Sequence, residues 1–167
     1  MKDMRLAKQI LSMKITHDRK VKKLWLSQKK YIEKVLERLS MNKAKSISTP
    51  LTNQFKLSSK QYPSTEEEKE YMENVPYAST VDSLMYTMMC TKPDISHAIG
   101  SISKFLFNPN KIYWIVVKWI LRYLDGTSKV CLCFGSGEPI LEGYTDADMA
   151  GNINTRKTTF GYLIIFA

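Results

Sequence analysis

The sequence has few of the residues that mark fibrous, low-complexity or disulfide-rich chains. It holds only 7 Gly and 6 Pro among 167 residues, which excludes a collagen-like repeat and a disordered Gly/Pro-rich composition. Its three cysteines cannot all pair within the chain. Since no export signal accompanies them, we expect reduced thiols in an intracellular protein.

Long apolar runs are also missing. No run approaches the roughly 20 residues that a membrane-spanning helix needs, so we expect no membrane partner. The first residues, Met1 to Arg5, lack the apolar stretch of a signal peptide, and nothing else in the sequence indicates a compartment. Apolar types still make up 44% of the chain, enough to bury the core of one ordinary domain or two small ones.

Acidic residues are scarce in the first third of the chain. Residues 1–60 hold 16 Lys and Arg against 4 Asp and Glu, a formal charge of +12, whereas residues 61–167 carry −3. The net charge of +9 therefore belongs to the first third alone. A charge of this sign suits a polyanionic partner but does not identify it.

The densest basic block runs over residues 19–25 and is followed by Lys29 and Lys30. It mixes cations with aromatic residues, as nucleic-acid-binding surfaces do. Its lysines could contact phosphates, while Trp25 could stack on a base or pack into a core. The alternative is a hairpin with a solvated charged face. The candidates for phosphate contact are Lys20, Lys22, Lys23, Lys29 and Lys30.

Two segments near the N-terminus predict a β-hairpin. Residues 10–17 alternate partly between apolar and polar types, and residues 23–27 form the second strand after a charged turn. Ser27 is then the expected N-cap of a helix over residues 28–39, whose apolar residues recur at helical spacing.

The middle of the chain predicts further helices. A short helix is expected near 65–73, inside a stretch that otherwise has the composition of a linker. From Ser79 the helical pattern returns, and its apolar face is expected to include Val81, Leu84, Met85, Met88 and Met89.

Pro93 is expected to end that helix and to open the next one, whose apolar side runs on to Leu106. A third helix is predicted over 111–124. Gly126 is well placed as its C′ residue, the position after a helix end that favours glycine.

The last forty residues predict strands. Residues 130–134 and 140–148 are strand candidates, and the apolar run over 161–167 is a stronger one. Because a bare apolar strand is an unusual domain end, we expect that the chain stops at a cut. Two aspartates on one strand face, Asp146 and Asp148, indicate either a solvated strand end or carboxylates of a metal site.

Seven segments, spread in order over the chain, carry a resemblance. They are Met1-Lys2-Asp3 with Ile10-Leu11-Ser12-Met13; Leu24-Trp25-Leu26-Ser27-Gln28 with Tyr31-Ile32; Ser48-Thr49-Pro50-Leu51; Ser83-Leu84-Met85-Tyr86; Cys90-Thr91-Lys92-Pro93-Asp94-Ile95; Trp119-Ile120-Leu121-Arg122-Tyr123-Leu124 with Gly126-Thr127; and Gly143-Tyr144-Thr145-Asp146-Ala147-Asp148. Together they resemble the Pol polyprotein of copia-type LTR retrotransposons.

The resemblance implies a stretch from the end of the reverse transcriptase palm, through the thumb and connection, to the start of ribonuclease H. The family's Tyr-x-Asp-Asp polymerase signature lies upstream and has no counterpart here, so we expect no polymerisation by this chain. Asp146 matches the first metal-binding aspartate of the ribonuclease H domain, and Asp148 is its neighbour. The other carboxylates of that Mg²⁺ site lie on later elements, so we expect neither stable Mg²⁺ binding nor hybrid cleavage by this chain alone.

The fold implied is an α+β fragment. It comprises a basic hairpin and helix over 1–45, a linker over 46–76, a three-helix cluster over 77–128, and the first strands of a ribonuclease-H-like mixed sheet over 129–167.

Several residues depart from the family pattern. The family usually has Gly where Arg5, Ser12 and Asp82 stand, and Met149 and Asn152 replace the usual Trp and acidic residue. These departures favour a truncated or degenerate copy. Asp82 would also cost desolvation energy at a packed helix start unless it is paired or exposed.

The function predicted is that of a reverse transcriptase/ribonuclease H fragment. Its basic first third would hold a template–primer or an RNA–DNA hybrid, and its partners would include other parts of the Pol polyprotein. Two alternatives stay open: a nucleic-acid-binding module without enzymatic activity, and a non-functional product that does not fold stably.

Overall fold

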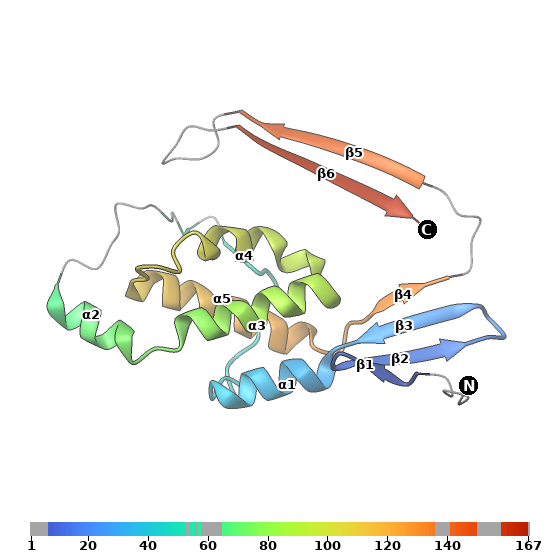
Figure 1. Cartoon of the computed structure of the whole chain (residues 1–167), viewed down its shortest axis with the longest axis horizontal. Coiled ribbons are helices and arrows are strands. Elements are labelled where there is room, and N and C mark those ends of the chain that lie inside the picture. Colours follow the sequence, from blue (N-terminus) through green and yellow to red (C-terminus); the bar gives the residue numbers. More distant parts are fainter. Residues whose placement is uncertain are drawn as a thin grey trace, which may run out of the picture. The chain divides into compact units, whose positions relative to one another are not determined.

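The computed structural model has a mixed α+β architecture, which confirms the expected class (Figure 1). It describes residues 7–52, 54–55, 57, 65–135, 141–149 and 158–166. The elements are β1 (Gln9–Ile10), β2 (Met13–Asp18), β3 (Lys23–Ser27), α1 (Lys29–Arg38), α2 (Glu66–Glu73), α3 (Tyr77–Cys90), the 3₁₀ turn η1 (Pro93–Ile95), α4 (Ser96–Ser103), α5 (Lys111–Thr127), β4 (Leu132–Phe134), β5 (Leu141–Asp148) and β6 (Thr159–Phe166).

The chain divides into two units, and each is described by itself. The helical unit holds residues up to 16 together with 25–132. The second unit holds residues 17–24 and those from 133 onward.

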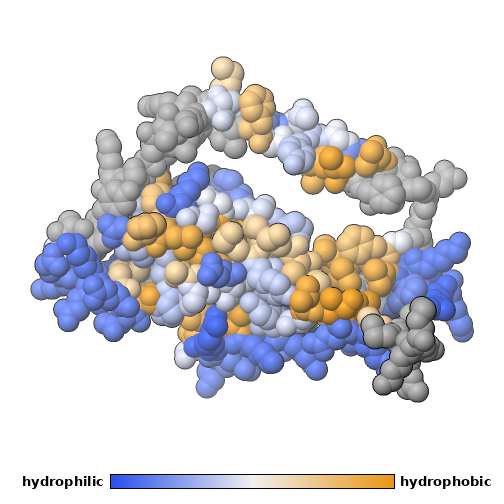
Figure 2. Space-filling view, viewed as in Figure 1, coloured by the Kyte–Doolittle hydropathy of each residue, from blue (hydrophilic) through white to orange (hydrophobic). Residues whose placement is uncertain are grey.

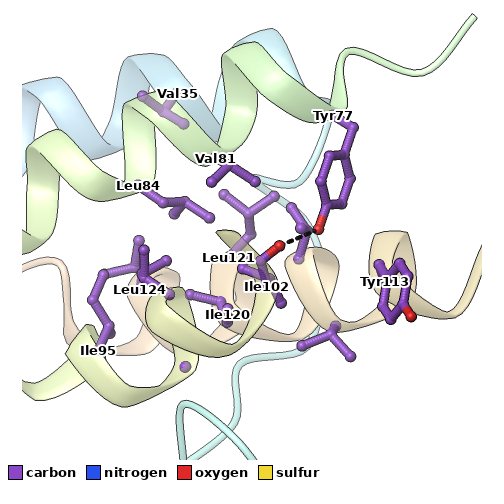
Figure 3. Packing of buried hydrophobic residues seen from close by; sticks show 14 of the residues in the cluster. Val35, Tyr77, Val81, Leu84, Ile95, Ile102, Tyr113, Ile120, Leu121 and Leu124 are labelled. Atoms are coloured by element: carbon purple, nitrogen blue, oxygen red, sulfur yellow. Dashed lines mark hydrogen bonds between the residues drawn. The ribbon is translucent and has the colours of Figure 1, made fainter. Parts of the chain in front are cut away.

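The helical unit is organised around one hydrophobic cluster, to which α1, α3, α4 and α5 contribute (Figure 3). Each fully buried aliphatic side chain contributes about 1.5–3 kcal/mol to folding. Tyr77, at the start of α3, is buried in the cluster, and its hydroxyl donates a hydrogen bond to the Ile102 carbonyl oxygen at 3.0 Å. That burial raises the pKa of Tyr77. The cluster includes Ile32, Val81, Leu84, Ile95, Ile99, Ile102, Tyr113, Val116, Val117, Ile120, Leu121 and Leu124.

The predicted helices are confirmed, because their apolar stripes find partners in this cluster. Two predicted core residues are wrong. Met89 is 79% exposed at the edge of the α3 stripe, and Leu106 is 36% exposed because α4 ends before it and helical spacing no longer sets its direction. Asp82 is exposed on α3, so the expected desolvation cost does not arise.

Gly126 lies inside α5, so the prediction that it follows the helix end is wrong. The helix continues to Thr127, and a Cβ atom at Gly126 would lie 3.1 Å from the Ser46 Cβ. Glycine therefore lets residues near Ser46 approach the helix closely. The same segment is held on α5 by Trp119, whose indole Nε1 donates to the Thr49 carbonyl oxygen at 2.9 Å.

Strands β1 to β4 form a sheet in the order β1-β2-β3-β4. The single strand predicted over 10–17 is wrong, because a two-residue turn at Leu11 and Ser12 divides it into β1 and β2. Both turn residues have positive φ, 45° and 61°, as a tight hairpin turn requires. The Tyr86 hydroxyl donates to the Leu11 carbonyl oxygen and anchors this turn on α3.

The start of α1 also differs from the prediction. Gln28, not Ser27, occupies the N-cap position, although the Ser27 hydroxyl still accepts a hydrogen bond from the Lys29 amide at 3.4 Å. Because β3 runs to Ser27, the chain turns from strand to helix within a single residue.

In the second unit, β5 and β6 pair antiparallel from Leu141 opposite Phe166 to Asp148 opposite Thr159. The strands predicted over 140–148 and 161–167 are thus confirmed, with β6 beginning two residues earlier. Gly135, after β4, has a φ of 109°, and a Cβ there would lie 1.9 Å from the Lys22 carbonyl oxygen. Only glycine fits at this position.

The hairpin turn offers a stability prediction. Ser12 occupies a left-handed conformation that costs a side-chain-bearing residue about 1–2 kcal/mol. We expect Ser12→Gly to raise the free energy of unfolding by about 1 kcal/mol, measured by urea denaturation. Ser101→Gly, inside α4, is the matched control and should lower it by about 0.5 kcal/mol. A Ser12→Gly chain no more stable than the parent would contradict the assignment of strain to this turn.

Candidate nucleic-acid interface

A groove of about 460 Å³ opens in the helical unit beside the first strands and the start of α1. Another hollow, of about 630 Å³, lies beside Thr49 and Trp119, but no charged side chain lines it. The first groove is therefore the candidate site for a charged ligand. It is lined by Gln9, Ser12, Lys14, Thr16, Trp25, Ser27, Lys29, Lys30, Glu33 and Cys131.

Strand alternation explains why these residues share one surface. Lys14 and Thr16 lie two positions apart on β2, as Trp25 and Ser27 do on β3, so each pair points to one face of its strand. The chain then turns directly into α1, whose first turn brings Lys29–Lys30 to the same groove. Nine of the ten lining residues thus lie between positions 9 and 33, where strand pairing brings them together.

The groove is predominantly cationic. Lys14, Lys29 and Lys30 face one carboxylate, that of Glu33. The Lys29 Nζ lies 3.6 Å from the Glu33 Oε1, but both side chains are about half exposed, so this pair contributes little and leaves the lysines open to a competing anion. Figure 2 shows the hydrophilic surface along α1.

The three tryptophans have different surroundings. Trp114 packs against the hydrophobic cluster, and Trp119 packs edge-on against Phe55 with ring centroids 5.5 Å apart. Trp25 is half-buried and lines the cationic groove. Its indole is therefore a candidate surface for a ligand with an apolar or aromatic part.

The predicted phosphate-contacting lysines fall into two groups. Lys29 and Lys30 lie together in the groove. Lys20 and Lys22 are exposed in the turn after β2, and Lys23 begins β3; these three belong to the second unit. Sequence reasoning missed Lys14, because strand pairing and not sequence order brings it close to Lys29 and Lys30. Period-two alternation on β2 was the available signal.

The predicted metal ligands lie on β5. Asp146 is exposed and stands opposite Gly161 on β6, and Asp148 pairs with Thr159 at the end of the strand. Within the described ranges, no three His, Cys, Asp or Glu side chains are grouped so that they could hold a metal ion. The residues described thus do not make up a Mg²⁺ site.

No helix in the described part of the chain has the length and apolar character to cross a membrane.

Sequence comparison identifies the family. The retrovirus-related Pol polyprotein from transposon TNT 1-94 of Nicotiana tabacum is 60% identical over 167 residues, all of this chain and 13% of that protein. Those from transposons RE1 and RE2 of Arabidopsis thaliana are 36% and 32% identical over 142 residues, 84% of this chain and 9% of theirs. The chain belongs to the copia-type retrotransposon Pol polyproteins.

The resemblance carried by the seven segments is thus confirmed, and the chain spans 13% or less of these relatives' lengths. No protein-family model matches the chain. No solved structure matches it either.

One of the seven segments of this Pol polyprotein chain, residues 90–95, forms a structural junction beside the groove. The Thr91 hydroxyl donates to the Gln28 Oε1 at 2.7 Å, and Gln28 is only 1% exposed. Gln28 stands between Ser27 and Lys29, two groove residues. The junction therefore fixes the groove wall to the end of α3, since a broken buried hydrogen bond costs about 1–3 kcal/mol.

The same junction holds the end of α5. Lys92 is 2% exposed, and its Nζ donates to the Thr127 carbonyl oxygen at 2.5 Å, while the Tyr123 hydroxyl donates to the Asp94 Oδ2 at 2.5 Å. Burial lowers the pKa of Lys92, against the opposing charge of Asp94. The hydrogen bond to Asp94, together with burial and the carboxylate charge, raises the pKa of Tyr123 to about 12.

The Tyr123–Asp94 bond predicts a pH dependence for this Pol polyprotein segment. The folded state holds the tyrosine proton more tightly than the unfolded chain, whose tyrosine pKa is about 10. This stabilisation is complete below pH 10 and is lost as the pH rises through about 12.

We expect Tyr123→Phe to lower the free energy of unfolding by about 1 kcal/mol near neutral pH. The difference from the parent should shrink as the pH rises above 10, in urea titrations at several pH values. If the difference in free energy of unfolding between Tyr123→Phe and the parent stays constant up to pH 11.5, the Tyr123–Asp94 hydrogen bond does not set the pKa of Tyr123.

Proposed function

We propose that this chain grips the sugar–phosphate backbone of a nucleic acid through the groove beside α1. The observation that carries the proposal is the joint presence of Lys14, Lys29, Lys30 and Trp25 in one groove. In the whole Pol polyprotein the ligand would be the template–primer or RNA–DNA hybrid, as the resemblance implies. Lys20, Lys22 and Lys23 are proposed as further phosphate contacts, on charge alone.

The physical basis is charge neutralisation with release of counterions. Lysine ammonium groups near a polyanion replace condensed cations, so affinity falls steeply as salt rises. Hydroxyl groups of Ser12, Thr16 and Ser27 also line the groove and are typical partners of phosphate and sugar oxygens. Such contacts fix position along a backbone without reading sequence.

The groove lysines can be tested by salt dependence. Each phosphate contact contributes a slope of about −0.9 to the logarithm of affinity against the logarithm of salt concentration. We expect Lys14→Gln, Lys29→Gln and Lys30→Gln combined to make this slope shallower by roughly 2 to 3, measured by fluorescence anisotropy with an RNA–DNA hybrid.

Lys34→Gln is the matched control, because Lys34 is exposed on the same helix but does not line the groove. Lys34→Gln should change the slope by less than one third of the change that the triple variant produces, which is the mean effect of one groove lysine. Equal slopes for the triple variant and the parent would overturn the proposal. The proposal would also be overturned if the chain unfolds cooperatively, and is therefore folded, but binds the hybrid too weakly to measure.

For the whole protein we propose reverse transcriptase and ribonuclease H activities, with residues 129–167 opening a ribonuclease-H-like domain. The division at 46, 77 and 129 also stays a prediction. An antiparallel strand pair that exposes Asp146 supports this proposal. In the whole protein Asp146, with Asp148 beside it, would bind Mg²⁺ together with carboxylates from other elements and from other parts of the polyprotein.

Hybrid cleavage by this chain alone should be absent. Two-metal nuclease chemistry needs several carboxylates from different elements, and the described residues group no such set. We expect no Mg²⁺-dependent product from a labelled RNA–DNA hybrid, with the parent chain and Asp146→Asn indistinguishable. Mg²⁺-dependent cleavage that Asp146→Asn abolishes would refute this and would identify an active nuclease instead of a binding module.

A further inference from the structure

We infer that the groove receives a single unstacked nucleotide, with its base on Trp25 and its phosphate among the lysines. The inference rests on the proposed nucleic-acid function and names the form of nucleic acid that this site takes. It predicts a preference for an unpaired strand end over the side of a continuous duplex.

The size of the groove supports this inference. A volume of about 460 Å³ is in the range of sites that enclose one small ligand, about 300–1,000 Å³. A stacked and paired base inside a duplex presents only its edges and its backbone to a protein. A base that has left the stack offers a face, and such a face is what an indole can contact.

The chemistry of the lining matches the parts of a nucleotide. The Trp25 ring provides an aromatic surface, and aromatic stacking accepts any base because every base has a π-face. Lys14, Lys29 and Lys30 provide charge for one phosphate and its neighbours. The hydroxyls of Thr16 and Ser27 lie on the same strand faces as Lys14 and Trp25, where a sugar would follow.

The position of Trp25 is not explained by packing alone. Its two neighbours on β3, Leu24 and Leu26, take the opposite strand face by alternation, and Trp25 faces the lysine groove. The Trp25 side chain lines a groove that also holds three lysines, and it is not part of the hydrophobic cluster. It does suit a ligand that is aromatic at one end and anionic at the other.

The experiment compares four probes by fluorescence anisotropy. Three are nucleic acids of matched sequence: a blunt RNA–DNA hybrid, the same hybrid with a three-nucleotide 3′ overhang, and the single strand. The fourth is polyglutamate. We expect the overhang to raise affinity roughly tenfold over the blunt hybrid. Displacement by a nucleoside monophosphate would show whether a free nucleotide competes for the same groove. Polyglutamate should bind more weakly than every nucleic acid.

Two substitutions separate stacking from folding. Trp25→Leu should remove the advantage of the overhanging hybrid over the blunt hybrid, while Trp25→Phe should keep most of that advantage. Urea denaturation identifies a variant that fails to fold. The comparison of probes with the parent chain needs no substitution and decides the matter if both variants unfold.

The outcomes distinguish the two claims. If no nucleic acid binds in a salt-dependent way, the proposed function itself is wrong. If the blunt and overhanging hybrids bind the parent chain equally, the lysines grip a backbone and the inference of a nucleotide site is wrong. Polyglutamate bound as tightly as nucleic acid would assign the groove to an acidic protein partner and would also overturn the inference.

Discussion

The groove depends on the hydrogen bonds at the end of α3. There the chain leaves one helix, and within four residues Thr91 contacts Gln28, Lys92 contacts the end of α5, and Asp94 contacts Tyr123. The hydrophobic cluster brings the helices together, but apolar packing is not directional. The Thr91–Gln28 bond fixes where α1 begins, and α1 carries two of the groove lysines into place. The other two contacts hold the end of α5.

Wherever the determinant of an element is local, the sequence predicts the fold well. Helices α3 and α5 follow from apolar spacing, and β5 and β6 from alternation, because each pattern matches one regular backbone geometry. The sequence predicts a strand at Leu11 and Ser12, because neither residue type favours the positive φ that both adopt. The sequence predicts Gly126 just after the helix end, whereas it lies inside α5. Its close neighbour is Ser46, eighty residues away, and only tertiary packing reveals such an approach.

The candidate site shows the same limit. Composition located the positive charge in the first third of the chain, and Lys29 and Lys30 do line the groove. Charge density alone, however, favoured Lys20, Lys22 and Lys23 over Lys14, which stands alone in the sequence. Strand pairing gives Lys14 its neighbours. A ligand-binding surface is therefore easier to detect by its charge than to delimit residue by residue.

The two proposed activities need different amounts of surrounding structure. The groove draws all but one of its lining residues from positions 9–33, so it forms wherever the hairpin, α1 and their junction fold. A two-metal nuclease site instead needs carboxylates from several elements held within a few ångströms of each other. Asp146, the proposed Mg²⁺ ligand, lies on an exposed strand. In the function that we propose, binding of nucleic acid therefore requires only this segment, whereas the proposed cleavage requires carboxylates from further elements beside Asp146.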